Sequence, residues 1–139
     1  MVMVWEQRAM RVGKRFLLLC VLACGCSKTT STDDLIADLA APDRGARIKA
    51  VRLLPQRKGE AAQVVPALIG ALKDKEADVR WSAAIGLGSF GDEAKSAIPA
   101  LQEAERDGDA RVRGAARVAL SRIDPVHFPA KAKARPAGH

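Results

Sequence analysis

The stretch Asp74–Gly91, DKEADVRWSAAIGLGSFG, decides the fold. Its acidic start predicts a loop, its small and aliphatic middle predicts a helix, and its glycines predict the helix end. Val79, Ala83 and Leu87 share one face of that helix because they recur at the helical period. The positions beside them are small: Ser82, Ala84, Gly86 and Gly88. One such helix cannot bury its own apolar face, so the pattern predicts similar helices on both sides.

A shift of 33 residues brings the chain into register with itself three times. The positions that match are Ala46-Arg47, Val79-Arg80 and Val112-Arg113; Ala50, Ala83 and Ala116; Leu54, Leu87 and Leu120; and Leu35, Leu68 and Leu101. A fixed period of this length is typical of stacked helical hairpins. We therefore expect three units, at about 33–60, 61–93 and 94–123.

Each unit is expected to be a pair of helices. The first helices are predicted at 33–40, 62–73 and 93–106, and the second helices at 44–54, 77–89 and 109–122. Ser31 or Thr32 is expected to cap the first of them. Pro66 and Pro99 lie near the starts of first helices, where a missing N–H costs little, or they kink a longer helix. Aromatic residues make up only 4% of the chain, which suits close-packed helices better than a β-sandwich.

The repeated motif resembles HEAT repeats, and in particular the short PBS-lyase HEAT-like variety. The matching features are a loop acid, then Val-Arg, then Ala-Ala-x-x-x-Leu; the candidate loop acids are Asp43, Asp74 or Asp78, and Asp107 or Asp109. The resemblance covers about residues 33–123 and implies an all-α fold, a short right-handed α-solenoid of about three hairpins. The first unit departs from the pattern, since Pro55 ends its second helix early and residues 56–59 loosen its link to the next unit. A terminal repeat is expected to be atypical.

Arginine recurs at the same position of every unit, as Arg47, Arg80 and Arg113. These side chains form an anion-binding ladder, or each pairs with a loop acid of its own or the adjacent repeat. The family resemblance favours the second interpretation, a structural ladder. A buried or interfacial arginine usually has a carboxylate partner.

The N-terminal segment has the pattern of an export signal. Four basic residues within 1–15 precede the uncharged run Phe16–Ala23, which is too short for the roughly 20 residues of a membrane-spanning helix. The end of that run, Leu22–Cys26, resembles a bacterial lipobox, which implies lipidation of Cys26, with Cys24 as the alternative. An ordinary cleaved signal with incidental cysteines is the other interpretation, and the start at Met1 or at Met10 is open.

The lipobox resemblance predicts the layout and location of the chain. Residues 1–25 are expected to be a lipoprotein signal peptide, and residues 26–32 the lipidated cysteine and a flexible tether. The chain would be exported and anchored to the cell envelope, facing the periplasm or on the outer membrane. Residues 124–139 are expected to be a basic, disordered tail.

Charge and chemistry exclude several classes of function. The chain has a formal charge of +7, but residues 33–123 hold 15 Lys and Arg against 14 Asp and Glu, so the repeats are nearly neutral. A nucleic-acid-binding domain concentrates basic residues on its folded face. No nucleophile with its base, no metal-ligand cluster and no phosphate loop stands out, so we expect no enzyme activity, cofactor, metal or small-molecule substrate.

A partner-binding surface is the remaining candidate site. Trp81 and Ile85 are the positions at which the middle unit differs most from its copies, and neighbouring repeats add Ile48, Arg52, Arg117 and Val118. An exposed Trp with nearby Arg is typical of protein-binding hot spots. The other interpretation is that Trp81 fills core space that Gly114 leaves open.

Three functions are consistent with this surface. The first is a non-catalytic interaction or scaffold module that binds an envelope protein. The second is a lyase-type or other enzyme accessory subunit acting through the repeat surface, since some relatives of these repeats are bilin lyases. The third is a short stub that extends or caps another repeat protein.

Overall fold

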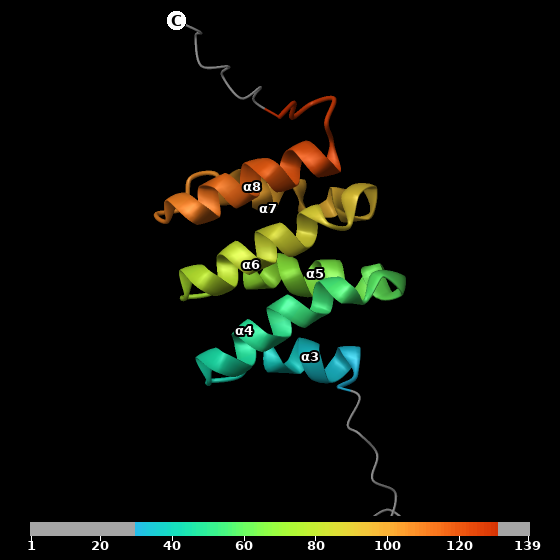
Figure 1. Cartoon of the computed structure of the whole chain (residues 1–139), viewed down its shortest axis with the longest axis vertical. Coiled ribbons are helices and arrows are strands. Elements are labelled where there is room, and N and C mark those ends of the chain that lie inside the picture. Colours follow the sequence, from blue (N-terminus) through green and yellow to red (C-terminus); the bar gives the residue numbers. More distant parts are fainter. Residues whose placement is uncertain (1–29, 131–139) are drawn as a thin grey trace, which may run out of the picture.

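The computed structural model describes residues 30–130, and within that range every regular element is helical. The helices form three hairpins: α3 (Thr32–Asp38) with α4 (Arg44–Leu53), α5 (Ala61–Ala71) with α6 (Ala77–Gly88), and α7 (Ile98–Ala104) with α8 (Ala110–Ile123). The hairpins stack in chain order along the long axis of the molecule (Figure 1). Helix α6 contacts both α4 and α8, so the second helices form one continuous layer. The predicted all-α, HEAT-like solenoid is confirmed.

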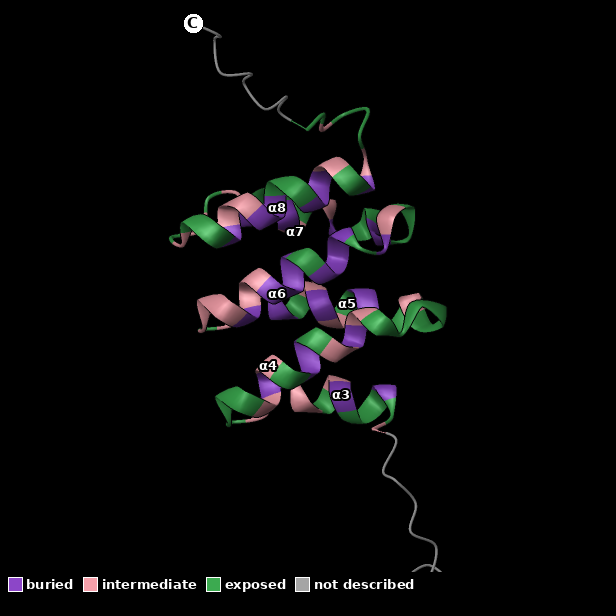
Figure 2. Cartoon of the chain, in the orientation of Figure 1, coloured by how far each residue is buried: buried purple, intermediate pink, exposed green. Residues whose placement is uncertain are grey.

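The core lies between the two layers and between successive hairpins (Figure 2). Val79, Ala83 and Leu87 are fully buried, as the helical pattern predicts. The leucines that repeat along the chain are buried with them: Leu35, Leu54, Leu68, Leu87, Leu101 and Leu120. The period of 33 residues therefore marks the positions that fill the core.

Two glycines of α6 allow its neighbours to come close. A Cβ on Gly88 would lie 2.9 Å from the Cα of Ala119 on α8, which is backbone and cannot turn aside. A Cβ on Gly86 would lie 2.7 Å from Cγ of Pro55, on the side of the first hairpin. The small residues of α6 thus serve its two opposite interfaces, as the sequence pattern predicts.

The helix ends follow the local sequence. Ser31 caps α3 in a capping box with Asp34, in which each side chain accepts from the other residue's backbone N–H. The helix predicted at 93–106 is wrong at its start: residues Gly91–Ala97 form 3₁₀ helix, and α7 begins only at Ile98. Ala94 has non-helical angles there, and Pro99 sits in the first turn of α7, where it is tolerated. Pro66, by contrast, lies inside α5.

The link between the first two hairpins is tied down rather than loose, which corrects the sequence-based expectation. Two short 3₁₀ segments, Leu54–Gln56 and Lys58–Glu60, follow α4. The ammonium of Lys58 donates to the carbonyl and hydroxyl oxygens of Ser89. It also lies 4.1 Å from the centroid of the Phe90 ring, a cation–π distance.

The predicted signal peptide, the two candidate lipidation residues Cys24 and Cys26, and residues 26–29 of the tether lie outside the described residues. So does the tail from residue 131 onward. At the C-terminal end of the tether, Ser31 caps α3 and Thr32 begins it. Of the last described residues, Phe128 packs against the core, whereas Val126 is 82% exposed. No helix within residues 30–130 is both long enough and apolar enough to cross a membrane.

Candidate partner-binding site

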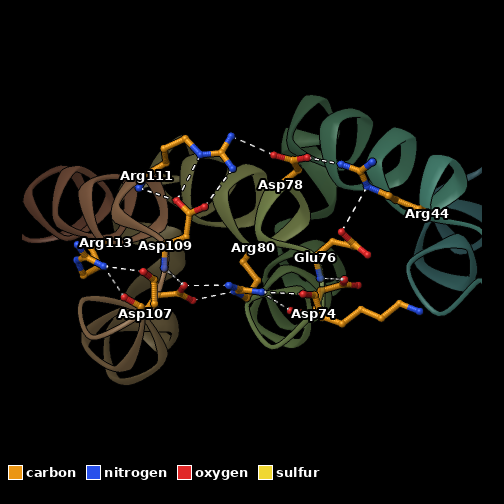
Figure 3. Close-up of polar contacts among 11 residues, drawn as sticks. Arg44, Asp74, Glu76, Asp78, Arg80, Asp107, Asp109, Arg111 and Arg113 are labelled. Atoms are coloured by element: carbon orange, nitrogen blue, oxygen red, sulfur yellow. Dashed lines mark hydrogen bonds and ion pairs between the residues drawn. The ribbon is translucent and has the colours of Figure 1, made fainter.

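Arg80 joins the second hairpin to the third through a two-pronged ion pair (Figure 3). Its Nε and Nη2 donate to Oδ2 and Oδ1 of Asp107, at 2.7 and 2.9 Å. Its Nη1 donates to the carbonyl oxygens of Asp74 and Lys75, at 2.8 and 3.1 Å. The guanidinium therefore closes the loop of its own hairpin and binds the loop of the next one.

Arg47 repeats this arrangement one hairpin earlier. Its Nε donates to Oδ2 of Asp74 at 2.8 Å, while its Nη1 donates to the carbonyls of Ala41 and Pro42. In both cases the carboxylate lies 27 residues after the arginine. Arg113 holds its loop in the same way, through the carbonyls of residues 107 and 108. Among residues 30–130, however, no carboxylate lies at ion-pair distance from Arg113, so the expected pairing is found at two of the three positions.

The ion pair shifts the acid–base behaviour of its members. The hydrogen bonds from Arg80 lower the pKa of the Asp107 carboxyl below its usual value, and the backbone N–H of Asp109 adds to this effect. In return, Asp107 raises the pKa of Arg80. Of the two candidate loop acids of the third unit, Asp107 is therefore the one that pairs with a repeated arginine, while Asp109 caps α8.

A second, outer line of charges was not evident from the sequence. Asp78 accepts from Arg44 of the first hairpin and, at 3.0 Å, from Nη1 of Arg111 of the third. These two hydrogen bonds, that from Arg111 first, lower the pKa of Asp78. Asp78 and Arg111 are 33 residues apart. Opposite charges at one register position are the signal that would have predicted the bridge.

Three of the six predicted partner-binding residues meet at one hollow. It lies between α4 and α6, has a volume of about 210 Å³, and is lined in part by Arg52, Trp81 and Ile85. Trp81 is half-buried and packs against the core, and Ile85 is 40% exposed. Pro55 forms part of the wall. The Trp81 ring therefore borders an apolar recess instead of lying fully inside the core.

The other three predicted residues lie elsewhere. Ile48 is half-buried and packs against the core. Arg117 and Val118 line a separate hollow of about 560 Å³ at the C-terminal end of the stack, together with Phe128. Arg117 also pairs with Glu105 at 3.3 Å. The structure thus divides the predicted stripe into a recess at Trp81 and a hollow at the end of α8.

Within residues 30–130, no group of three or more His, Cys, Asp or Glu side chains is arranged to hold a metal ion. The hydroxyl of Ser82, buried in the wall of the Trp81 hollow, has no hydrogen-bond partner among the described residues. Apart from the arginine ladder and the outer line of charges at Asp78, the side chains between the hairpins pack against one another as in a protein core.

Comparison with known proteins agrees with this geometry. The family model described as HEAT repeats matches residues 32–124, which span all three hairpins. HEAT repeats generally mediate protein–protein interactions. A search of curated proteins finds no match to the chain.

Proposed function

The chain belongs to the HEAT-repeat family, and from that premise we propose that it is a non-catalytic protein-binding module held at the bacterial cell envelope. The observation that carries the proposal is the hollow between α4 and α6, where Trp81, Ile85 and Arg52 come together. A large aromatic ring, an exposed aliphatic side chain and a guanidinium are the usual components of a binding hot spot.

The recess suits an apolar side chain of a partner protein. Its walls are mainly apolar, and burying an aliphatic side chain there would remove Ile85 and the exposed edge of Trp81 from water. Arg52 is exposed at the rim, where it can meet an acidic group of the partner. A small pocket with one charged group at its edge favours a short anchor segment over a broad, flat interface.

Attachment to the envelope rests on the sequence. The basic N-terminal residues, the short apolar run and the cysteine at its end support lipidation of Cys26. Two or more acyl chains suffice for stable anchoring, where one chain is marginal. The residues between Cys26 and the cap of α3 at Ser31 would then hold the repeats close to the membrane, and the partner would be an envelope protein.

Site-specific photo-crosslinking tests the binding surface. A photoreactive amino acid at position 85 is expected to give a discrete adduct in cells, and Trp81→Ala in the same chain should reduce that adduct at least about fivefold. The matched control is the same amino acid at position 126, since Val126 is 82% exposed but lies outside the hollow. Equal adducts from both positions, or an adduct unaffected by Trp81→Ala, would contradict the proposed surface.

Membrane fractionation tests the anchor separately. The Cys26→Ala chain is expected to leave the membrane fraction, while Cys24→Ala stays in it. If Cys26→Ala remains membrane-bound and Cys24→Ala is released, the anchor is Cys24. If both remain bound, the lipid-anchor proposal is wrong.

A further inference from the structure

Two of the three repeated arginines pair with an aspartate of the next hairpin, whereas the third, at the C-terminal end of the stack, has no such partner among residues 30–130. Arg47 and Arg80 each hold their own loop through Nη1 and present Nε and Nη2 to an aspartate of the next hairpin. Arg113 is fixed by the same two loop carbonyls, at 2.8 and 3.0 Å. Its remaining donors meet no carboxylate within residues 30–130. A guanidinium is therefore positioned at the end of the stack as if for a further hairpin.

From this geometry we propose that the C-terminal end of the solenoid binds a helical hairpin of a partner protein, whose loop supplies a carboxylate to Arg113. The proposal is independent of the Trp81 hollow and adds a second surface. Next to Arg113, the face of α8 borders the hollow of about 560 Å³ lined by Arg117, Ser121 and Phe128. A stacked helix would enter this hollow beside Phe128, Pro129 and Ala130, which also line it.

The first hairpin of a second copy does not match this end of the stack. The register position of the ladder acids Asp74 and Asp107 is Ala41 in the first hairpin, which therefore offers no carboxylate to an arginine before it. The face of α4 at that end carries Lys49, where later units have Ser82 and Ala115. End-to-end stacking of two copies is therefore disfavoured, and the occupant is a different protein.

The charge of Arg117 indicates a further property of the partner hairpin. Arg117 takes the register position that Val51 and Ala84 hold at the two internal interfaces, where both are fully buried. Val51 and Ser82 of the following hairpin line the same hollow. Because Arg117 has the register position of Val51, a partner residue at the register position of Ser82 would face Arg117. The partner hairpin thus needs an acid in its loop for Arg113. A second acid on its second helix would share Arg117 with Glu105, which already pairs with it at 3.3 Å.

A donor version of the chain can serve as the probe. It is the full chain carrying Ala41→Asp and Lys49→Glu, which place the two acids on its first hairpin. It also carries Leu53→Ala, because the residue at the same register position of the third hairpin is the smaller Ala119. Arg113→Ala in the donor prevents it from binding itself. The matched control replaces the two new acids by amides, as Ala41→Asn and Lys49→Gln. Circular dichroism checks that both versions fold.

Binding of the donor to the immobilised wild-type chain, in mild detergent, is measured by biolayer interferometry. We expect the acidic donor to bind at least about tenfold more tightly than the amide control, because a two-pronged charge-assisted contact is worth at least that ratio. Arg113→Ala or Arg113→Lys in the immobilised chain should remove most of the difference, since lysine lacks the fork and only the contact of the second acid with Arg117 is left.

Two results would overturn the proposal: equal binding of the acidic and amide donors, or undiminished binding to the Arg113→Ala chain. The immobilised Trp81→Ala chain should bind the donor as well as the wild type does. The outcome at Arg113 is therefore separate from the outcome at the Trp81 hollow.

Discussion

The interface between α6 and α8 is tighter than the interface between α4 and α6, although both are formed by the same register positions. At the tighter interface, Gly88 lies against the backbone of Ala119 with no room for a Cβ. At the looser one, a Cβ on Gly86 would also clash, but with the ring of Pro55 and not with the backbone of the neighbouring helix, and a hollow of about 210 Å³ opens beside Trp81.

The ion pairs of the two interfaces differ in the same way, with the shorter hydrogen bonds at the tighter interface. Arg80 binds Asp107 with two short hydrogen bonds, at 2.7 and 2.9 Å. Arg47 binds Asp74 with one short bond of 2.8 Å and one long bond of 3.5 Å. The repeat period determines which residues face each other, but side-chain volume determines whether the gap between them closes. One repeat interface is therefore closed, while the other leaves the recess to which we assign the proposed partner.

Removing the ladder arginine of the tighter interface should have the largest effect. Arg80→Ala is expected to lower the free energy of unfolding by about 3 kcal/mol, because it leaves Asp107 largely buried without a cation and two loop carbonyls without donors. Urea unfolding followed by circular dichroism measures the change.

The matched control is Arg113→Ala at the open end of the ladder. It removes only hydrogen bonds to loop carbonyls and should cost less than about 1 kcal/mol. Equal losses for the two variants would mean that the carboxylate adds nothing to the stability of the stack.

Adding a methyl group at the close contact should have the next largest effect. Gly88→Ala is expected to destabilise the chain by about 1–3 kcal/mol, since the new Cβ must displace the backbone of α8. Gly114→Ala is the control, because nothing lies within 4 Å of a Cβ there, and alanine stabilises a helix interior by about 0.5–1 kcal/mol. Thermal melting of both variants should give shifts of opposite sign, and a raised midpoint for Gly88→Ala would contradict the close approach.

The sequence was sufficient to predict the stacked hairpins but not which side chains are exposed on their surfaces. Leu54, Leu87 and Leu120 share a register position and are all buried, because equivalent positions of a repeat meet equivalent neighbours. Exposure of Trp81 does not follow from register, since it depends on the volume of residues from two hairpins, among them Pro55. The hollow is therefore a property of the packed pair of helices.

The choice among the loop acids also required the structure. Asp107 and Asp109 both precede α8, and their spacing suits helix capping equally well. Only Asp107 reaches Arg80, while the side chain of Asp109 accepts from the backbone N–H of Arg111 at the helix start. The two aspartates therefore have different partners although they are only two residues apart, and a period of 33 does not specify which of them meets the arginine.

Acid should weaken the tighter interface through Asp107. Its pKa is lowered in the folded chain, whereas an unfolded aspartate has a pKa of about 3.9. Its contribution to stability is therefore complete above about pH 4 to 5 and is lost as the pH falls through the lower folded value. Urea midpoints of the wild type and of Asp107→Asn should differ by a constant amount from pH 7 to pH 5 and converge below pH 4. In an Arg80→Ala background the convergence should be much weaker; a gap that widens in acid would contradict the assignment.

The smallest expected effect concerns the looser interface. Ser82 and Ala115 occupy the same register position, so Ser82→Ala makes the wall of the first interface like that of the second. The Ser82 hydroxyl is buried without a hydrogen-bond partner among residues 30–130, and shortening the side chain to the methyl group of alanine removes this uncompensated polar atom. Alanine also has the higher helix propensity, so the variant should gain up to about 1 kcal/mol. A loss of stability on urea unfolding would show that this hydroxyl is satisfied in solution, and that the recess beside Trp81 is more polar than its walls suggest.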